Sequence, residues 1–200
     1  MMMAKAIIGK VYCSTAQKVL VVRRRPNVVN GGGFVVMDCS AQKVLFRVDG
    51  SFVPGKKGDL ILREADGGAL LLMRPMGGMV QALGVYKKWK GYTVDYHGSR
   101  KLVFSLREPN SCLVKNNAIR IFTRSRGCDF KISGYFPDKC CAIVDSKGNQ
   151  VAQVEIMKEV QEFMESKELY HVVVKPGMDQ AFVFGVIAIL DYIYGESTHC

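Results

Sequence analysis

One stretch near the carboxyl end restricts the possible folds of this chain more than any other: residues 181–190 carry no polar side chain. The preceding segment Lys175–Met178 interrupts regular structure, and Asp179 can accept hydrogen bonds from the first free N–H groups of a helix. A helix that is apolar on every face must be surrounded by protein or lipid. A helix from Gln180 to Tyr194 would be about 22 Å long, short of a bilayer span. We therefore expect the preceding chain to enclose it.

A second interpretation remains open, because the same stretch is rich in Val, Ile and Phe and could form a buried strand.

The 200 residues suit a single domain over 1–200 with one large core. The sequence has no apolar run of 18 residues and no signal-peptide pattern. Its seven cysteines have no regular spacing, which indicates free thiols in a reducing compartment. We expect a cytoplasmic protein, with a peripheral position at the plasma membrane or a nuclear location as alternatives.

A hairpin pattern recurs along the chain: apolar residues, an acid, two further residues, a small residue and apolar residues again. The four copies cover 34–48, 60–73, 92–106 and 142–154. The acid can accept a bond from the backbone two residues on, and glycine at the fourth position tolerates the left-handed conformation of a type I turn with a bulge. Ala41 takes that position in the first copy, which should cost about 1 kcal/mol. The repetition of Ala16–Leu20 at Ala41–Leu45 suggests a fifth hairpin near the start.

Further strands are expected over 130–136 and 170–174, which gives ten to twelve strands joined locally. An antiparallel meander of that size closes to hide its edges. A barrel of more than eight strands leaves a lumen that side chains alone cannot fill, and the apolar helix would fill it. A surface helix is also expected over 155–169, where apolar residues recur at helical spacing.

Several features follow one another in an order that resembles the LURP-one-related proteins of plants. They are Leu20–Arg24, Gly32–Asp38, Phe46–Asp49, Leu70–Arg74, Trp89–Tyr92, Phe130–Gly134, Asp145–Gly148, Val151–Val154 and Val174–Phe182. Together they cover nearly the whole chain. The resemblance implies the fold of the Tubby-like C-terminal domain, a 12-stranded barrel around a central C-terminal helix, and no enzyme activity comes with that fold.

The resemblance also implies possible functions. Tubby-like relatives tether to phosphoinositide membranes and are linked to transcription, phospholipid scramblases share the fold, and the plant family is associated with pathogen response. This chain departs from the pattern in two places. Residues 155–168 are more acidic and more helical than expected, and the calcium-binding segment of scramblases has no match, which argues against calcium-driven lipid scrambling.

The formal net charge of +10 favours anionic partners. Residues 84–131 alone carry eleven bases against three acids. At the end of an expected strand, Arg23 and Arg25 share one face, with Arg24 opposite. Two guanidinium groups on one face could hold a phosphate by bidentate bonds. The alternative is that they only solvate the end of the strand.

Three lysines, Lys87, Lys88 and Lys90, surround Trp89. This arrangement suits an anionic membrane surface, with the indole at the level of the headgroups. In the alternative interpretation Trp89 packs into the barrel while the lysines keep a strand edge soluble. The family resemblance favours packing.

Other chemistries find little support in the sequence. Gly31–Gly33 is followed by a strand rather than by a Gly-Lys-Ser/Thr sequence and a helix, so we expect a turn and not a phosphate loop. His97, His171 and His199 have no Cys or Asp at metal-ligand spacing. We predict no catalytic residue, no metal and no cofactor.

The leading hypothesis is a monomeric, non-enzymatic Tubby-like module that binds acidic phospholipid in a plant defence or signalling context. The predicted lipid contacts are Arg23, Arg25, Lys87, Lys88, Trp89 and Lys90. The predicted core of the helix is Phe182, Val183, Val186, Ile187, Ile189 and Leu190. A nucleic-acid-binding or transcription-linked protein and a scaffold with an unidentified protein partner remain alternatives, and an enzyme is the weakest interpretation.

Overall fold

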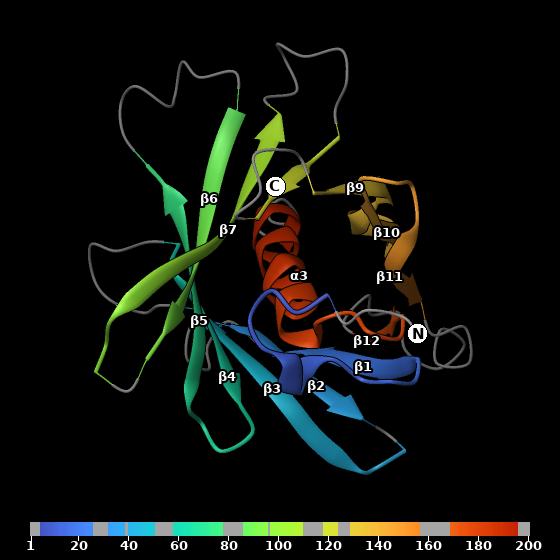
Figure 1. The fold of residues 1–200 in the computed structure, drawn as a ribbon. Coiled ribbons are helices and arrows are strands. Elements are labelled where there is room, and N and C mark those ends of the chain that lie inside the picture. The colour runs from blue at the N-terminus through green and yellow to red at the C-terminus, as the bar shows by residue number, and fades with distance from the viewer. Residues whose placement is uncertain are drawn as a thin grey trace.

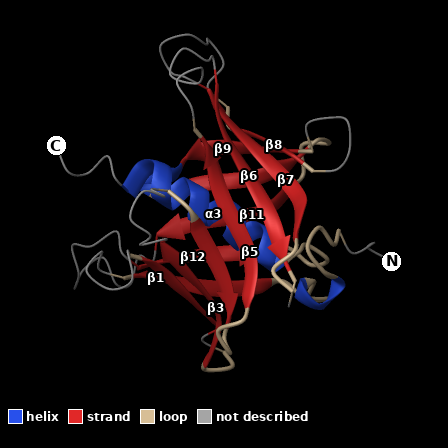
Figure 2. Cartoon of the chain, turned by 90° about the vertical axis from the view of Figure 1, so that its left-hand side faces the viewer, coloured by secondary structure: helices blue, strands red, loops and turns tan. Residues whose placement is uncertain are grey.

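A closed antiparallel barrel surrounds one long α-helix in the computed structural model of the protein (Figures 1 and 2). The structure describes residues 5–25, 32–38, 40–50, 58–77, 86–95, 97–109, 118–123, 129–156 and 169–195. Within these residues, twelve strands pair in sequence order and β12 pairs with β1 to close the barrel. The predicted fold class is confirmed.

The strands are β1 (Lys18–Arg24), β2 (Gly33–Asp38), β3 (Lys43–Gly50), β4 (Leu60–Glu64), β5 (Ala69–Met76), β6 (Tyr86–Val94), β7 (Arg100–Pro109), β8 (Arg120–Phe122), β9 (Phe130–Tyr135), β10 (Cys140–Asp145), β11 (Gln150–Ile156) and β12 (Leu169–Val174). The enclosed helix is α3 (Gln180–Gly195), and two short 3-10 helices are η1 (Lys10–Tyr12) and η2 (Phe136–Asp138).

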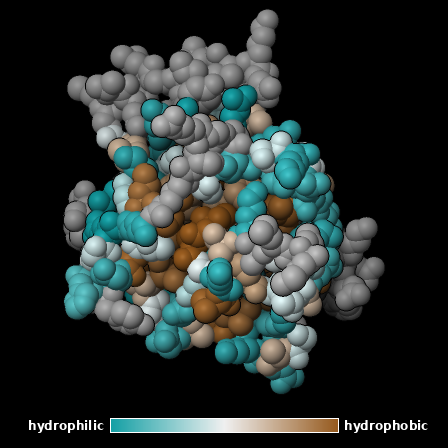
Figure 3. All heavy atoms as spheres, in the orientation of Figure 1, coloured by the Kyte–Doolittle hydropathy of each residue, from teal (hydrophilic) through white to brown (hydrophobic). Residues whose placement is uncertain are grey.

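The apolar stretch 181–190 forms the part of α3 that lies inside the barrel, so the buried-strand interpretation is wrong. All six residues predicted as the core of the helix are fully buried. Phe182 packs against Phe104 of β7 and Phe130 of β9, with ring centroids 5.4 and 5.0 Å away. From the side of Figure 1, hydrophobic residues gather at the centre, over the region of α3, and hydrophilic residues surround them (Figure 3). Burial inside the barrel wall explains why the helix needs no polar face.

Asp179 begins the helix and also holds a distant part of the chain. Its Oδ1 accepts a bond from the backbone N–H of Phe182 at 3.1 Å, which confirms the predicted cap. Its Oδ2 accepts three further bonds from the N–H groups of Ile7, Ile8 and Gly9, at 3.0, 2.7 and 3.0 Å. One buried carboxylate therefore fastens the N-terminal segment to the start of α3.

The hairpin turns follow the predicted chemistry in part. The acid accepts the backbone N–H two residues on at Asp38, Asp95 and Asp145, whereas in the turn after Glu64 it is Asp66 that accepts the N–H of Gly68. The predicted glycines have positive φ, namely Gly67 (93°), Gly98 (75°) and Gly148 (88°). In the first copy the prediction for Ala41 is wrong, because Gln42 takes the left-handed position with φ 48°. Asp38 pairs with Lys43, five residues on, so this loop is one residue longer than the Asp145–Asn149 turn.

Two further expectations are wrong. The repeat Ala16–Leu20 does not form the turn and second strand of a hairpin, as Ala41–Leu45 does, because the described residues before β1 form η1 and isolated bridges; β1 forms its hairpin with the following strand, β2. The surface helix expected over 155–169 is wrong at both ends, because Glu155 and Ile156 lie in β11 and Leu169 begins β12. Residues 157–168 lie outside the described residues.

Candidate anion-binding surface

The three arginines at the end of β1 have different environments. Arg23 is exposed on the outer face of the barrel, whereas Arg24 faces inward and its Nε lies 3.2 Å from Asp191 Oδ2 of α3. Arg25 donates to the carbonyl oxygens of Gly32 and Val48 and forms an ion pair with Asp49. The predicted opposite orientation of Arg24 is present, but Arg25 is bound by the protein itself.

The lysines around Trp89 lie on both sides of β6. Trp89 is 4% exposed and packs edge-on against Tyr192 of α3, with ring centroids 5.2 Å apart, so the indole lies in the core as the packing interpretation predicts. Lys88 and Lys90 alternate with Trp89 and lie on the outer face. Lys87 is exposed and opposite Glu108 in the register of β6 and β7. Burial raises the pKa of Glu108, and the nearby charge of Lys87 opposes that rise.

The two predicted groups do not form one surface. Arg23 and Arg25 belong to the β1 end of the sheet, Lys87 to Lys90 lie on β6, and β2 to β5 stand between them in one direction around the barrel. A phosphate held by all of these residues together is therefore excluded.

The strand register instead brings Lys88 together with three other cations. Lys88 of β6 is directly opposite Arg107 of β7, Arg107 is opposite Arg120 of β8, and Arg120 is opposite Lys131 of β9. All four are exposed. Neighbouring strands lie about 5 Å apart, so the four residues span roughly 15 Å across the barrel wall. We call Lys88, Arg107, Arg120 and Lys131 the basic row.

The basic row carries charge that the fold does not use. Like charges directly opposite each other on neighbouring strands destabilise a sheet. None of the four forms an ion pair with a carboxylate among the described residues, although Arg107 lies over the ring of Phe122 at 4.5 Å. An outward row of uncompensated cations is therefore a surface suited to an anionic partner.

Arg107, Arg120 and Lys131 were missed as candidates because they are far apart in the sequence. One signal pointed toward them: the eleven bases against three acids in residues 84–131. Only the pairing of β6 to β9 shows which of these bases share a face and a row.

A buried polar cluster joins the other end of α3 to the wall. Lys139 Nζ lies 3.6 Å from Asp191 Oδ1 and 4.6 Å from the centroid of the Tyr170 ring. Burial lowers the pKa of Lys139 to about 8, and the carboxylate of Asp191 opposes that shift. Lys139 and Asp191 are only 5% and 7% exposed, so a substrate cannot reach them as an acid–base pair.

Two features of the described residues bear on other classes of function. No helix in these ranges is long and apolar enough to cross a membrane. No three His, Cys, Asp or Glu side chains in the same ranges come together as metal ligands.

The fold and the surface define a class of protein: an antiparallel barrel filled by its own C-terminal helix, with a row of cations on its outer wall. The LURP-one-related family model matches residues 18–191, and the chain belongs to this family.

Two relatives in Arabidopsis thaliana are similar over nearly their whole length. Protein LURP-one-related 6 is 55% identical over 197 residues, which cover 98% of this chain and 100% of the relative. Protein LURP-one-related 16 is 50% identical over 205 residues, which cover 97% and 95%. The fold is similar to the X-ray structure of an Arabidopsis thaliana protein, with a TM-score of 0.66, 18% identity and coverage of 94% of this chain and 98% of the other.

Proposed function

We propose that the protein is a non-enzymatic module that binds membranes containing acidic phospholipid, in a plant defence or signalling context. The observation that carries this proposal is the basic row, in which four exposed cations are aligned on neighbouring strands without carboxylate partners among the described residues. A basic residue near an acidic membrane surface contributes about 1 kcal/mol of binding free energy. Four such residues acting together would contribute about 4 kcal/mol.

The predicted contacts divide between this surface and the rest of the protein. Lys88 belongs to the basic row, and Lys90 lies beside it on the outer face of β6. Trp89 is buried and contributes to packing of the core, and Arg25 forms an ion pair with Asp49 that stabilises the end of the barrel. Arg23 lies on β1, away from the row.

A nucleic acid is the main competing partner, and the surroundings of the row disfavour it. Proteins that bind single strands combine a basic track with aromatic rings on which bases stack. Among the described side chains, the aromatic one beside the row is Phe122, which already has the guanidinium of Arg107 over its ring. Duplex readers place a helix or ribbon into a groove, whereas the basic row lies on the wall of a closed barrel.

Vesicle co-sedimentation tests the proposal, with phosphatidylcholine vesicles that contain or lack phosphatidylserine or a phosphoinositide. The Arg107→Gln/Arg120→Gln variant removes two charges from the row. Its affinity for acidic vesicles should fall about thirtyfold, since two contacts of about 1 kcal/mol are lost. The matched control, Arg23→Gln/Lys43→Gln, removes two exposed charges from β1 and β3 and should bind like the wild type.

Equal binding to neutral vesicles, or equal loss in the two variants, would contradict the lipid assignment. Binding to DNA or RNA instead, with an affinity that falls steeply with salt and depends on the row, would assign the surface to nucleic acid.

A further inference from the structure

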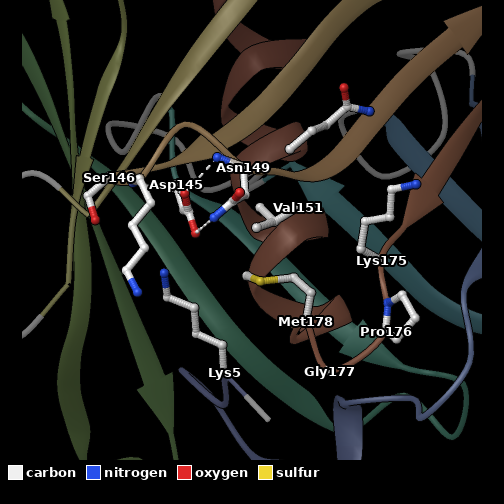
Figure 4. Close-up of a pocket in the computed structure, with 11 residues that line it drawn as sticks. Lys5, Asp145, Ser146, Asn149, Val151, Lys175, Pro176, Gly177 and Met178 are labelled. Carbon is white, nitrogen blue, oxygen red and sulfur yellow. Dashed lines mark hydrogen bonds between the residues drawn. The ribbon is translucent and has the colours of Figure 1, made fainter. Parts of the chain in front are cut away.

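A pocket of about 700 Å³ lies at the end of the barrel where α3 begins, separate from the basic row (Figure 4). Three segments that are distant in sequence line it: Lys5, the β10–β11 turn at 145–150, and the turn into α3 at 175–178. Figure 4 shows Lys5 and Lys175 on either side of Val151 and Met178. Its volume is in the range of pockets that bind small molecules.

The pocket is positively charged. Lys5, Lys147 and Lys175 line it together with one carboxylate, that of Asp145. That carboxylate already serves the hairpin turn, because Oδ1 accepts the N–H groups of Lys147 and Asn149, both at 2.9 Å, and Oδ2 accepts the amide of Asn149 at 3.3 Å. The lining has a formal charge of plus two, and the oxygens of Asp145 are occupied.

Neutral groups hold two of these ammonium groups in place. Lys5 Nζ lies 4.1 Å from the centroid of the Phe130 ring, and Lys175 Nζ donates a hydrogen bond of 3.1 Å to Gln17 Oε1. None of the three lysines forms an ion pair with a carboxylate in the part of the chain that the structure describes. The charge of Lys5 also attracts the carboxylate of Asp145, but a ring and an amide do not neutralise a cation, so the net charge of plus two stays available to a ligand.

Apolar side chains complete the lining. Met178 is 3% exposed and Val151 is partly buried. Pro176 lies between Lys175 and Met178 in the turn into α3. A ligand that satisfies this lining needs an anionic group for the lysines and an apolar body for Met178 and Val151. We propose that the pocket binds a small organic dianion with an apolar body, such as an aryl or alkyl phosphate ester.

Nuclear magnetic resonance of protein labelled with [13C-methyl]methionine tests this site directly, with phenyl phosphate as the probe. The methyl signal of Met178 should shift and saturate, whereas that of Met73, which is fully buried elsewhere in the barrel, should not move. Phenol, which has the ring without the charge, should leave Met178 unchanged. No shift of Met178 at millimolar phenyl phosphate, or an equal shift with phenol, would overturn the proposal.

Two lysine variants test the charge requirement. Lys147→Gln and Lys175→Gln should each weaken phenyl phosphate binding at least about tenfold, because each loses a hydrogen bond to a charged group. Lys88→Gln, in the basic row, should bind the probe like the wild type, and unchanged thermal unfolding shows that each variant is folded. Equal affinity in the wild type and both pocket variants would refute the site.

The source of the ligand is distinguished by the vesicle assay. If Lys147→Gln and Lys175→Gln also lose binding to acidic vesicles, the ligand is a lipid headgroup. If they lose only phenyl phosphate, it is a soluble ester. A basic-row variant that binds phenyl phosphate but not vesicles shows that the two sites are independent. A wild type that binds phenyl phosphate but no vesicle supports the pocket and contradicts the proposed lipid binding.

Discussion

Replacing Asp179 with alanine removes the buried carboxylate that connects the N-terminal segment to the start of α3. Asp179 is fully buried, and its two oxygens accept four backbone N–H bonds, one from the first turn of α3 and three from Ile7, Ile8 and Gly9. The substitution leaves all four donors without their acceptor.

The magnitude follows from those bonds. The lost cap costs about 1 kcal/mol. Each hydrogen bond to a charged group contributes about 1.5–3 kcal/mol. The lower value applies here, because Lys5 and Cys13 hold the N-terminal segment by isolated bridges and its donors can turn to water. The total is about 5.5 kcal/mol, a large part of the 5–15 kcal/mol that stabilises a typical domain.

Urea unfolding followed by circular dichroism measures this loss. With a slope of about 2 kcal/mol per molar urea, the midpoint should fall by about 2–3 M. Asp66→Ala is the matched control, because Asp66 is exposed and accepts one turn hydrogen bond, from Gly68 at 2.9 Å, so its free energy of unfolding should change by about 0.5 kcal/mol.

Removing residues 1–9 from the protein provides an internal check. Without the three donors, Asp179→Ala should cost only the cap, about 1 kcal/mol. If Asp179→Ala destabilises the full chain by no more than the Asp66→Ala control, the carboxylate does not fasten the N-terminal segment and the reasoning is refuted.

Three further predictions concern the core. Gly91→Ala should lower the free energy of unfolding, measured in urea, by about 3 kcal/mol, because a Cβ at Gly91 would lie 2.2 Å from the ring of Phe104. Gly77 has open space around it, so Gly77→Ala should be nearly neutral. Equal effects of the two substitutions would contradict the packing of Gly91 against the ring. Burial lowers the pKa of Lys139 to about 8, so the unfolded chain binds this proton more tightly than the folded protein does. The free energy of unfolding of the wild type, relative to that of Lys139→Met, should therefore rise between pH 8 and 10.5. A fall over that range would contradict the burial of Lys139. Burial raises the pKa of Cys141 to about 12, so iodoacetamide at about pH 8 should modify exposed Cys140 and spare Cys141. Mass spectrometry of single-cysteine-to-serine variants measures the two rates of modification. Equal rates would contradict the burial of Cys141.

The enclosed helix could be predicted from the sequence because its determinants are local. The apolar stretch 181–190 has no polar face to present to water, and Asp179 precedes it at the position of a cap. The turns at Gly67, Gly98 and Gly148 were equally local, since the acid and the glycine of each turn are three residues apart.

The basic row could not be predicted in the same way, because it depends on register. A slip of one residue in the pairing of β7 with β8 would place Arg107 opposite a residue of the other face. The position of Arg25 was equally inaccessible, since Asp49 meets it only when β3 lies beside β2 and the end of β1. The three bonds from Ile7, Ile8 and Gly9 to Asp179 join residues about 170 positions apart, a distance over which sequence pattern gives no signal.

If the basic row binds acidic phospholipid, the wall formed by β6 to β9 faces the membrane. A fluorescent amino acid incorporated at Ser105, between Lys90 and Phe122 in the strand register, would report contact with a quencher attached to lipid headgroups. The same label at Val19, which is 48% exposed on β1, reports the other side of the barrel. On acidic vesicles we expect strong quenching at position 105 and little at position 19. Bound protein that is quenched equally at both positions, or more at position 19, would contradict this expectation.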